Sequence, residues 1–489
     1  MSSTSIDVEV AIVGSGFSGL AMGIQLKKAG IESFRILEKA QDVGGTWREN
    51  TYPGAACDIP SHLYSFSFEP NPSWSRSYSP QPEILEYLRH CARKYGMLPH
   101  IQFGAEVIGA EHDVASGTWL VRTRDGATLR ARALVLGNGG LHVPSYPDIP
   151  GRETFEGTTF HSACWNHDYD LRGKRVAVIG TGASAIQFVP RIAPDVASMH
   201  VFQRTAPWIV PKADRAFRAR TKALLSRSRT LQRALRAAIY VQHEARALGF
   251  VVEPRILKLA EVLARRHLEA SIPDDALRAK LTPDYRMGCK RILPTNEWYP
   301  ALLRENVEVV TDRIDSITPR GVRTKDGVTR EVDAILYGTG FAVADYLATI
   351  PVRGTSGATL SEVWKGAPEA YLGITVSGFP NLFLLMGPNT GLGHNSMVFM
   401  IEAQARYAAQ CIEALRARRL RTLDVRAGVQ AEFNERLQHD LAGTIWASGC
   451  NSWYLAAAGG RNSLTWPGFT FDYWRRTRRV ELADYTLTP

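Results

Sequence analysis

The sequence predicts an α/β fold made of two Rossmann-like dinucleotide-binding domains, with a helical insertion in the second. Two observations predict the paired domains. An apolar run leading into a glycine-rich turn and a helical pattern occurs near the N-terminus, and the same succession returns in the middle of the chain. A third observation predicts the insertion, because an Arg-rich stretch with helical spacing follows the second copy.

The first glycine-rich turn follows the apolar residues 8–13 (VEVAIV) and precedes a helical pattern. Its Gly14-x-Gly16-x-x-Gly19 spacing places backbone N–H groups and a helix N-terminus where they can bind a pyrophosphate. Glu38 lies at the end of the next predicted strand, where a carboxylate can accept hydrogen bonds from ribose hydroxyls. The residues expected at this site are Gly14, Gly16, Phe17, Ser18, Gly19 and Glu38.

The second turn has the spacing Gly180-x-Gly182-x-x-Ala185 after the apolar residues 175–179 (RVAVI). The strand expected after it, MHVFQR, ends at Arg204 where the first unit has an acid. A guanidinium can bind a 2′-phosphate that a carboxylate would repel, so the sequence predicts NADP here rather than NAD. The alternative is a surface arginine at a strand end. Two sites of opposite 2′ chemistry together predict FAD reduced by NADPH.

The domain organisation follows from these units and from the strands that return to them. Residues 133–140 (ALVLGNGG) and 332–341 (VDAILYGTGF) each resemble a buried strand that re-enters a nucleotide-binding sheet. We therefore predict an FAD-binding domain over 1–149 and 341–489, an NADP-binding domain over 150–212 and 286–340, and a helical insertion over 213–285.

Composition and charge limit the metal sites, cellular location and partners that this chain is expected to have. The chain of 489 residues has a formal net charge of +10 and six cysteines with no C-x-x-C pair, so no zinc site or other metal site is predicted. No export signal or membrane-spanning stretch is read, and we expect a cytoplasmic protein without membrane insertion. The basic helical segment is interpreted as a solvated helix surface rather than a nucleic-acid site. The sequence does not indicate whether the protein is a monomer or an oligomer.

The cysteine content also indicates which molecule accepts electrons from the reduced flavin. A dithiol reductase needs two closely spaced cysteines beside its flavin, and none of the six has such a neighbour. Oxygen is therefore the expected acceptor. Three other readings stay open at this point: an N- or S-oxygenating flavin monooxygenase, a non-oxygenating NADPH-dependent flavoprotein reductase, and a basic nucleic-acid-binding protein.

Three stretches resemble signatures of Baeyer–Villiger monooxygenases. FEGTTFHSACW carries a fingerprint of Phe155, Gly157, His161 and Trp165, and GGTWRENTYPGAACD (44–58) and MGCKR (287–291) resemble two further signatures. The related enzymes that oxidise nitrogen and sulfur usually have Tyr where this chain has Trp165. One departure is Ala56, at a position that is often Arg in the family.

The resemblance implies an FAD-dependent, NADPH-consuming monooxygenase. Such enzymes insert one oxygen atom of O2 next to a ketone carbonyl by way of a flavin C4a-peroxide, giving an ester or lactone. It implies that Arg291 supplies a permanent positive charge to the developing anion, and that Asp58 pairs with Arg291 and orients it. The small-molecule partners would be a ketone and O2.

The resemblance also implies a set of cofactor contacts. Arg204, Thr205 and Lys290 would hold the NADP 2′-phosphate, and Arg291 and Asp58 would face the cofactors. The NADP pyrophosphate would lie against Gly180, Thr181, Gly182, Ala183, Ser184, Ala185 and Gln187. The flavin would lie against Gly45, Thr46, Trp47, Tyr64 and Val107, with Trp453 near the nicotinamide ribose. His161 is expected to couple domain motion rather than to transfer protons, and His394 is assigned no catalytic role.

Overall fold

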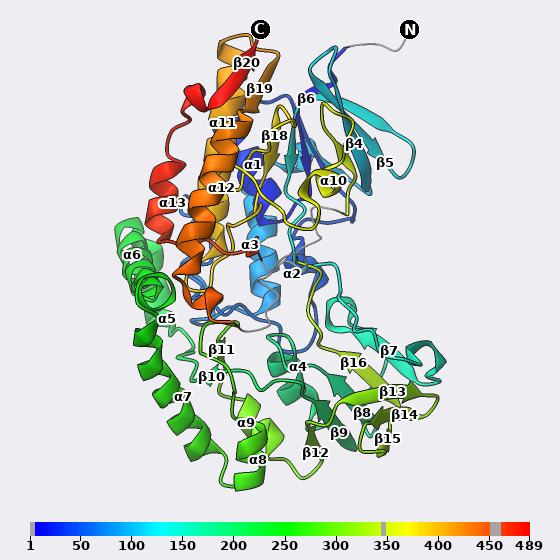
Figure 1. Ribbon diagram of the computed structural model, residues 1–489. Coiled ribbons are helices and arrows are strands. Elements are labelled where there is room, and N and C mark those ends of the chain that lie inside the picture. The colour runs from blue at the N-terminus through cyan, green and yellow to red at the C-terminus, as the bar shows by residue number, and fades with distance from the viewer. Residues whose placement is uncertain (1–4, 344–348, 450–460) are drawn as a thin grey trace.

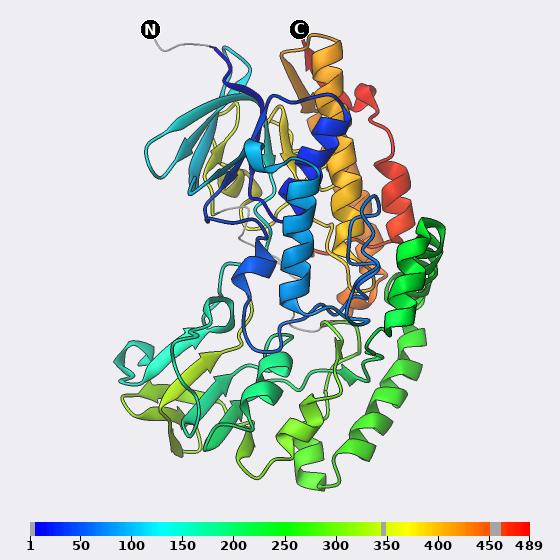
Figure 2. The ribbon, with the colours of Figure 1, turned by 180° about the vertical axis from the view of Figure 1, so that it is seen from behind.

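The structure, a computed structural model, describes residues 5–343, 349–449 and 461–489. Two β-sheets lie at opposite ends of the molecule, and a column of helices runs along one side between them (Figure 1). The view from behind shows the two sheets joined by extended segments (Figure 2). The predicted α/β class with two dinucleotide-binding sheets is confirmed.

The first sheet has the strand order β17-β4-β5-β6-β1-β2-β3, and β18 also pairs with β6. Its centre is parallel, because β1 pairs in the same direction with both β2 and β6, whereas β4, β5 and β6 form an antiparallel meander. The strands are β1 (Val8–Val13), β2 (Phe34–Glu38), β3 (Ile101–Phe103), β4 (Val107–Asp113), β5 (Thr118–Thr123), β6 (Thr128–Leu136), β17 (Val352–Arg353) and β18 (Leu382–Leu384).

Both ends of the chain build the core of this sheet. Helix α1 (Phe17–Lys28) packs against α11 (Met397–Ala417), and α3 (Gln81–Lys94) covers the same face. The apolar residues Val10, Ile12 and Leu20 are fully buried among them. Burial on both faces explains why β1 reads as a continuous apolar run rather than as an alternating one.

The second sheet is parallel throughout, with the order β12-β9-β8-β16-β7. Strand β9 ends at Phe202, so the expectation of a strand reaching Arg204 was wrong by two residues. Helices α4 (Ala185–Ile192) and α9 (Trp298–Leu302) pack on this sheet, and β13 (Ile314–Thr318), β14 (Gly321–Thr324) and β15 (Thr329–Glu331) form a separate meander. The sheet strands are β7 (Thr158–His161), β8 (Arg175–Ile179), β9 (Ser198–Phe202), β12 (Val307–Val310) and β16 (Ala334–Tyr337).

Helices occupy the segment for which an insertion was predicted. Two short parallel strands, β10 (Ile209–Val210) and β11 (Leu293–Pro294), lie side by side where the chain leaves for these helices and returns from them. The boundaries proposed for the domains stay predictions. The helices are α5 (Ala219–Arg227), α6 (Arg229–Ala245), a π-helical turn (Leu248–Val252), α7 (Leu257–Ser271) and α8 (Asp275–Lys280).

The two segments that connect the sheets pair with each other. Pro144 and Phe341 form an antiparallel bridge, and the backbone N–H of Ser145 donates to the carbonyl of Gly340 at 3.0 Å. His161, at the end of β7, is fully buried beneath them, with the rings of Tyr146 and Phe341 against its imidazole. A fingerprint residue thus lies where the two halves of the molecule meet.

The remaining described elements complete the C-terminal half. Helix α12 follows the short strand β19, which pairs with β20. Of the described helices, none is long and apolar enough to cross a membrane. These elements are α10 (Leu360–Trp364), β19 (Thr422–Val425), α12 (Ala427–Ala442), α13 (Thr470–Arg476) and β20 (Tyr485–Thr488).

Asp424 on β19 predicts a pH dependence of stability. Its carboxylate accepts a hydrogen bond from the Gly378 backbone N–H, and burial raises its pKa from 3.8 to about 6. The folded state therefore binds the proton more tightly than the unfolded chain, and the free energy of unfolding falls as the pH rises through this window. We expect Asp424→Asn to be more stable than the wild type at pH 8, by about 2 to 3 kcal/mol, and by no more than about 0.5 kcal/mol at pH 4, where most of the difference is gone.

Urea unfolding at both pH values measures this difference. Glu435→Gln is the matched control, because Glu435 is an exposed carboxylate on the neighbouring helix α12. Its substitution should change neither curve. An Asp424→Asn protein no more stable than the wild type at pH 8 would contradict the prediction.

Candidate functional site

The first glycine-rich turn, between β1 and α1, has no room for side chains. Gly14 adopts a φ of +89°, a left-handed conformation that favours glycine. A Cβ on Gly19 would lie 1.8 Å from the Gly14 carbonyl oxygen, so this glycine allows the helix to pack directly on the strand. Phe17 and Ser18, the first residues of α1, are buried. The turn and the helix N-terminus have the form that a dinucleotide pyrophosphate requires.

Glu38 lies beside this turn, as its position at the end of β2 predicts. Its Oε2 accepts hydrogen bonds from the Ser15 backbone N–H at 2.9 Å and from Ser15 Oγ at 2.7 Å. Its Oε1 accepts from Arg48 Nη1 at 3.1 Å. The Glu38 carbonyl in turn receives the N–H of Ala105, which brings the start of β4 and the buried Val107 to the same edge of the sheet. These contacts fit a ribose-binding carboxylate.

A second turn packs on the first. Gly45 has a φ of +51°, and a Cβ on it would lie 3.2 Å from the Gly16 Cα. The short helix α2 (Thr46–Glu49) follows at once and carries Trp47, whose indole N–H donates to the Tyr64 hydroxyl at 3.2 Å. The Phe17 ring packs edge-on against Tyr64, with centroids 5.2 Å apart. The flavin-side residues expected from separate stretches of sequence are thereby brought together.

Gly16→Ala separates folding from flavin binding. A Cβ at Gly16 would meet nothing closer than the Gly45 Cα at 3.6 Å, which is ordinary van der Waals contact, so the chain should fold. The second glycine of such a turn lets the backbone approach the pyrophosphate, and a methyl group there blocks that approach. We expect a folded protein whose flavin content, measured by absorbance, falls about tenfold or more.

The control for this prediction is Gly428→Ala in helix α12. A Cβ there would meet nothing within 4 Å, and the residue lies outside the turn. Its flavin content should equal that of the wild type. Full flavin occupancy in Gly16→Ala would show that the turn does not hold the pyrophosphate.

The second glycine-rich turn, between β8 and α4, repeats this geometry. Gly180 has a φ of +106°, and a Cβ on it would lie 2.5 Å from the Gly338 carbonyl oxygen. Gly182, Ala183 and Ser184 lead into α4, which begins at Ala185. The Thr181 hydroxyl donates to the Thr205 carbonyl at 3.3 Å, which holds the turn against the end of β9. These residues fit a second dinucleotide.

Two cations lie together beyond β9. Burial lowers the pKa of Lys290, and the positive charge of the neighbouring Arg204 lowers it further. Arg204 is exposed, and within residues 5–343, 349–449 and 461–489 neither side chain forms an ion pair. The Asp284 carboxylate acts on the pKa of Lys290 in the opposite direction, and the Lys290 ammonium lies 4.6 Å from the centroid of the Tyr285 ring. The two close like charges still repel each other, and a bound anion would relieve that repulsion. The pair fits the 2′-phosphate of NADP.

Arg291 and Asp58 form an ion pair across 233 residues of sequence. Arg291 donates from Nε at 2.7 Å and from Nη2 at 2.5 Å to one oxygen, Asp58 Oδ2. The two side chains are 34% and 25% exposed, so the pair is partly sheltered from water but still accessible. Burial raises the pKa of the nearby Tyr64 hydroxyl, on which the charges of Asp58 and Arg291 act in opposite directions. The pair thus lies beside the flavin-side cluster.

The turn that carries Asp58 is also bonded to the second glycine-rich turn. Gln187 Nε2 donates to the Ala56 carbonyl at 3.0 Å, and its Oε1 accepts from the Ala56 N–H at 3.3 Å and from the Tyr52 hydroxyl at 2.9 Å. Position 56, where this chain departs from the signature that it resembles, therefore contributes through its backbone. The segment that carries Asp58 is thereby a wall shared by the two glycine-rich turns, with the Arg291–Asp58 pair next to it.

Arg236 was missed by sequence reasoning. It projects from α6 and donates to the backbone carbonyls of His62, Leu63 and Ser65 at 3.0, 3.1 and 2.9 Å. Its only signal was its place, four residues after Gln232, on the inner face of an amphipathic helix. Tyr52 carried no periodic signal at all. Both act on the segment between Tyr52 and Ser65, which carries Asp58 and Tyr64.

The two histidines of the sequence analysis are buried, and their imidazoles are uncharged at neutral pH. Burial lowers the pKa of His161 to about 4, and its Nδ1 accepts the Ala163 N–H at 3.0 Å. Burial likewise lowers the pKa of His394 to about 4. Their positions favour structural roles, and a coupling role for His161 stays a prediction. Trp453 lies outside the described residues.

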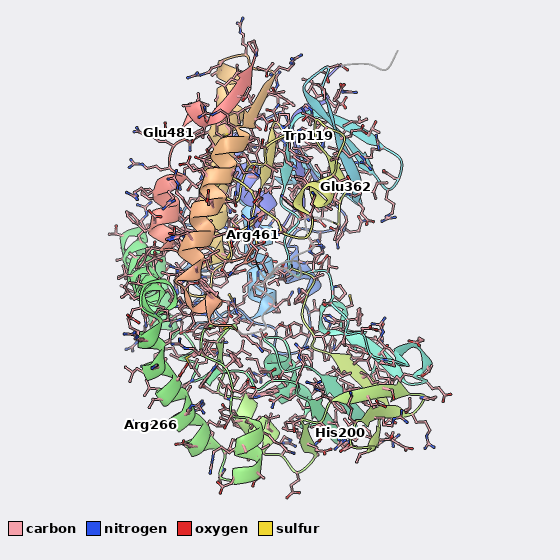
Figure 3. The ribbon with its side chains drawn as sticks, in the orientation of Figure 1. Trp119, His200, Arg266, Glu362, Arg461 and Glu481 are labelled. Carbon is pink, nitrogen blue, oxygen red and sulfur yellow. The ribbon has the colours of Figure 1, made fainter. Side chains whose placement is uncertain are left out.

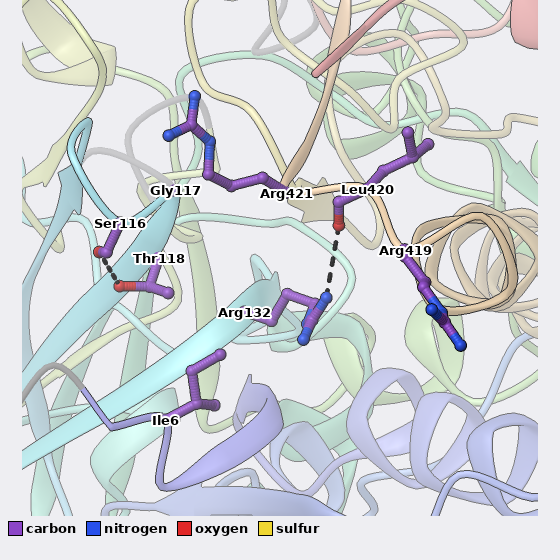
Figure 4. A pocket seen from close by; sticks show the side chains of 8 residues that line it. All are labelled: Ile6, Ser116, Gly117, Thr118, Arg132, Arg419, Leu420 and Arg421. Atoms are coloured by element: carbon purple, nitrogen blue, oxygen red, sulfur yellow. Dashed lines mark hydrogen bonds between the residues drawn. The ribbon is translucent and has the colours of Figure 1, made fainter. Parts of the chain in front are cut away.

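A separate cavity of about 200 Å³ lies away from these groups, beside β5 and β6 of the first sheet and the chain that follows α11 (Figure 4). Arg132, Arg419 and Arg421 are among its lining residues, and Arg132 Nη1 donates to the Leu420 carbonyl at 3.3 Å. The cluster of arginines at the end of α11 suits the negative end of that helix. This cavity contains none of the expected site residues.

Comparison with known proteins identifies the family. A family model described as "Pyridine nucleotide-disulphide oxidoreductase" matches residues 11–246. A Baeyer–Villiger monooxygenase of Pseudomonas aeruginosa is 48% identical over 98% of this chain and 91% of its own length. The chain belongs to the Baeyer–Villiger monooxygenase family. The resemblance inferred from the fingerprint and the two further signatures is thus confirmed.

Two solved structures share the fold of this family member over its whole length. Cyclohexanone monooxygenase from Rhodococcus sp. Phi1 bound to NADP+ has a TM-score of 0.89 and 29% identity, covering 99% of this chain and 100% of that one. OTEMO in complex with FAD and NADP has a TM-score of 0.89 and 26% identity, with the same coverage. Neither comparison tests the individual site residues, whose cofactor contacts stay predictions.

Proposed function

We propose that this chain uses FAD and NADPH to insert one oxygen atom of O2 beside the carbonyl of a ketone, giving an ester or lactone. Family membership and the paired glycine-rich turns support both cofactors. When bound, the flavin accepts a hydride from NADPH and activates O2 for transfer of one oxygen atom. The residues of the chain bind and orient the reactants and hold charge in place.

The two turns would hold the two dinucleotides on either side of a shared wall. Gly14, Gly16 and Gly19 with Glu38 would bind FAD, and Gly180 and Gly182 with Arg204 and Lys290 would bind NADP. The hydrogen bonds of Gln187 to Ala56 and Tyr52 fix the segment that carries Asp58 against the second turn. The hydride donor and acceptor would meet beside Asp58.

Arg291 and Asp58 carry the chemical part of the proposal. Oxygen insertion develops negative charge, including on the carbonyl oxygen of the ketone, and a preorganised cation lowers the energy of that state. Arginine suits this role because it stays protonated at any working pH. The double hydrogen bond to a single Asp58 oxygen fixes the guanidinium plane and leaves the other Asp58 oxygen outside that contact. This ion pair is the single observation that carries the proposal.

The principal alternative is oxygenation of nitrogen or sulfur, which needs no such cation. The fingerprint residue Trp165 favours ketone oxidation only because it matches the family signature. Its ring packs against Phe160 and Phe188 beside the second sheet and so has no evident part in the chemistry. A non-oxygenating reductase would share the cofactor sites but would release hydrogen peroxide. We place the enzyme in the cytoplasm, with a ketone and O2 as partners and no nucleic-acid partner.

Product analysis under ¹⁸O2 tests the proposal. The purified protein with FAD and NADPH would be offered a panel of linear, cyclic and aromatic ketones together with a thioether and a tertiary amine. We expect at least one ketone to give an ester or lactone carrying one ¹⁸O atom. Labelled sulfoxide or N-oxide with no ester would favour the alternative, and peroxide without any labelled product would indicate a reductase.

A further inference from the structure

The helices between β10 and β11 expose an unusual number of large apolar side chains. Of the eighteen exposed large hydrophobic residues in the described part of the chain, eight fall between Leu224 and Leu263. Scattered single exposed residues are ordinary, whereas a contiguous set indicates an interaction surface. Six of the eight, which we name the outer stripe, are 43% to 68% exposed: Val241, Leu248, Val252, Ile256, Leu259 and Leu263.

Helical spacing gathers the outer stripe on one side. Ile256, Leu259 and Leu263 recur at intervals of three and four residues at the start of α7, which places them on one face. Val241 and Leu248 follow the same spacing along the end of α6 and the π-helical turn after it. The stripe therefore spans the end of α6, the π-helical turn and the start of α7, and these helices lie at the outer edge of the molecule (Figure 1).

The inner faces of α6 and α7 contact the rest of the protein. On α6, Arg236 binds the His62–Ser65 carbonyls, and Tyr240 and Glu244 bond to the Thr470 hydroxyl at 3.0 and 2.7 Å. On α7, Leu257 and Leu268 are buried in the core. The inner face is thus fixed to the body of the protein, whereas the six residues of the outer stripe belong to none of the apolar clusters formed by the described residues.

The charge of the residues near the stripe indicates what kind of partner would bind there. Residues 213–285 contain fifteen Lys and Arg and eight Asp and Glu, and the excess lies in 213–240, which holds eight Lys and Arg and one Asp. This basic part is α5 and most of α6, where Arg227, Arg229 and Arg233 are exposed, and it adjoins the Val241 end of the stripe. Lys258 and Arg266 are exposed on α7, and Arg266 projects from its outer side (Figure 3). Neither forms an ion pair with any described residue. A second copy of the same basic face would be repelled, whereas an anionic surface would be attracted.

We propose that the outer stripe and its flanking cations dock this protein on the surface of a membrane that contains anionic lipid. Apolar side chains on one face of basic helices are the features of a helix lying in the interface plane of a bilayer. Leu259 and Leu263 enter the acyl boundary while Lys258 and Arg266 meet lipid phosphates. This peripheral contact needs no spanning helix and does not depend on the proposed oxygenation.

Vesicle cosedimentation with the FAD-bound protein tests the proposal. Vesicles of phosphatidylcholine alone are compared with vesicles that also contain phosphatidylglycerol, and the protein is expected to sediment with the second kind, less so as salt is raised. In Leu259→Ser/Leu263→Ser the partition coefficient should fall about tenfold. The control is Leu98→Ser/Leu303→Ser, at two exposed leucines outside the stripe (44% and 45% exposed, against 68% and 57% for Leu259 and Leu263), which should bind as the wild type does.

Four outcomes would overturn the proposal. One is failure of the wild type to bind anionic vesicles, and a second is equal binding by an outer-stripe variant that retains its flavin. Another is preferential binding to a short DNA duplex at the same salt, insensitive to the leucine substitutions, which would indicate a nucleic-acid surface. The last is a concentration-dependent dimer that the leucine substitutions dissociate, which would assign the stripe to contact between copies.

Discussion

Arg291→Ala should reduce ester formation by about a thousandfold while NADPH still reduces the flavin at a rate within about tenfold of the wild type. Removing one preorganised charge or donor from a developing anion costs between a hundredfold and a thousandfold in rate, and here no other cation is bonded to Asp58 in the described residues. Hydride transfer between the two dinucleotides does not need that charge. NADPH should therefore still be consumed, with its electrons released as hydrogen peroxide.

Stopped-flow flavin reduction and ester yield measure the two halves of this prediction. Arg286→Ala is the matched control, since Arg286 is an exposed arginine five residues earlier in the same segment, and both its activities should be those of the wild type. Undiminished ester yield in Arg291→Ala would remove Arg291 from the mechanism. Loss of flavin reduction to the same extent as ester yield would assign it to cofactor binding.

Arg204→Ala should raise the KM for NADPH about ten- to a hundredfold and leave the KM for NADH unchanged. Hydrogen bonds to a charged group contribute about 1.5 to 3 kcal/mol, which corresponds to this range. Lys290 remains in the variant, so a residual preference for NADPH is expected. Steady-state oxidation of the two nucleotides by both proteins measures the change.

The control for the nucleotide preference is Arg172→Ala. Arg172 is exposed near the start of β8 and is paired with Asp170, so its loss should affect neither KM. An unaltered ratio of the two KM values in Arg204→Ala would mean that the 2′-phosphate is recognised elsewhere. Equal KM values in the wild type would remove the argument for NADP.

The parts of the fold that sequence predicted are those in which local pattern and tertiary role coincide. The turns at Gly14 and Gly180 were predictable because strand, glycines and helix follow one another within a few residues. The helices of α6 and α7 were visible from spacing alone. Strand β7 was not expected, because its residues TTFH lie within the fingerprint and have no alternation to distinguish them.

The contacts that assemble the site could not be read from local pattern. Arg291 and Asp58 are 233 residues apart, and by default each would be a surface residue. The bonds from Gln187 to Ala56 and from Arg236 to the His62–Ser65 segment join different regions of the chain. Only a family resemblance signalled the first pair. Helical spacing places Arg236 on an inner helix face, but the sequence signalled the partners of neither Arg236 nor Gln187, because those partners are backbone atoms that any residue provides.

The central claim is that a permanent cation, oriented by Asp58, lies against the reacting part of the flavin. A crystal structure of this chain with FAD and NADP+ bound tests it most directly. We predict that the Arg291 guanidinium faces the isoalloxazine ring, with the Asp58 hydrogen bonds retained or exchanged for contacts to the nicotinamide. A structure in which Arg291 points away from the ring, with solvent or another side chain in its place, would contradict the account.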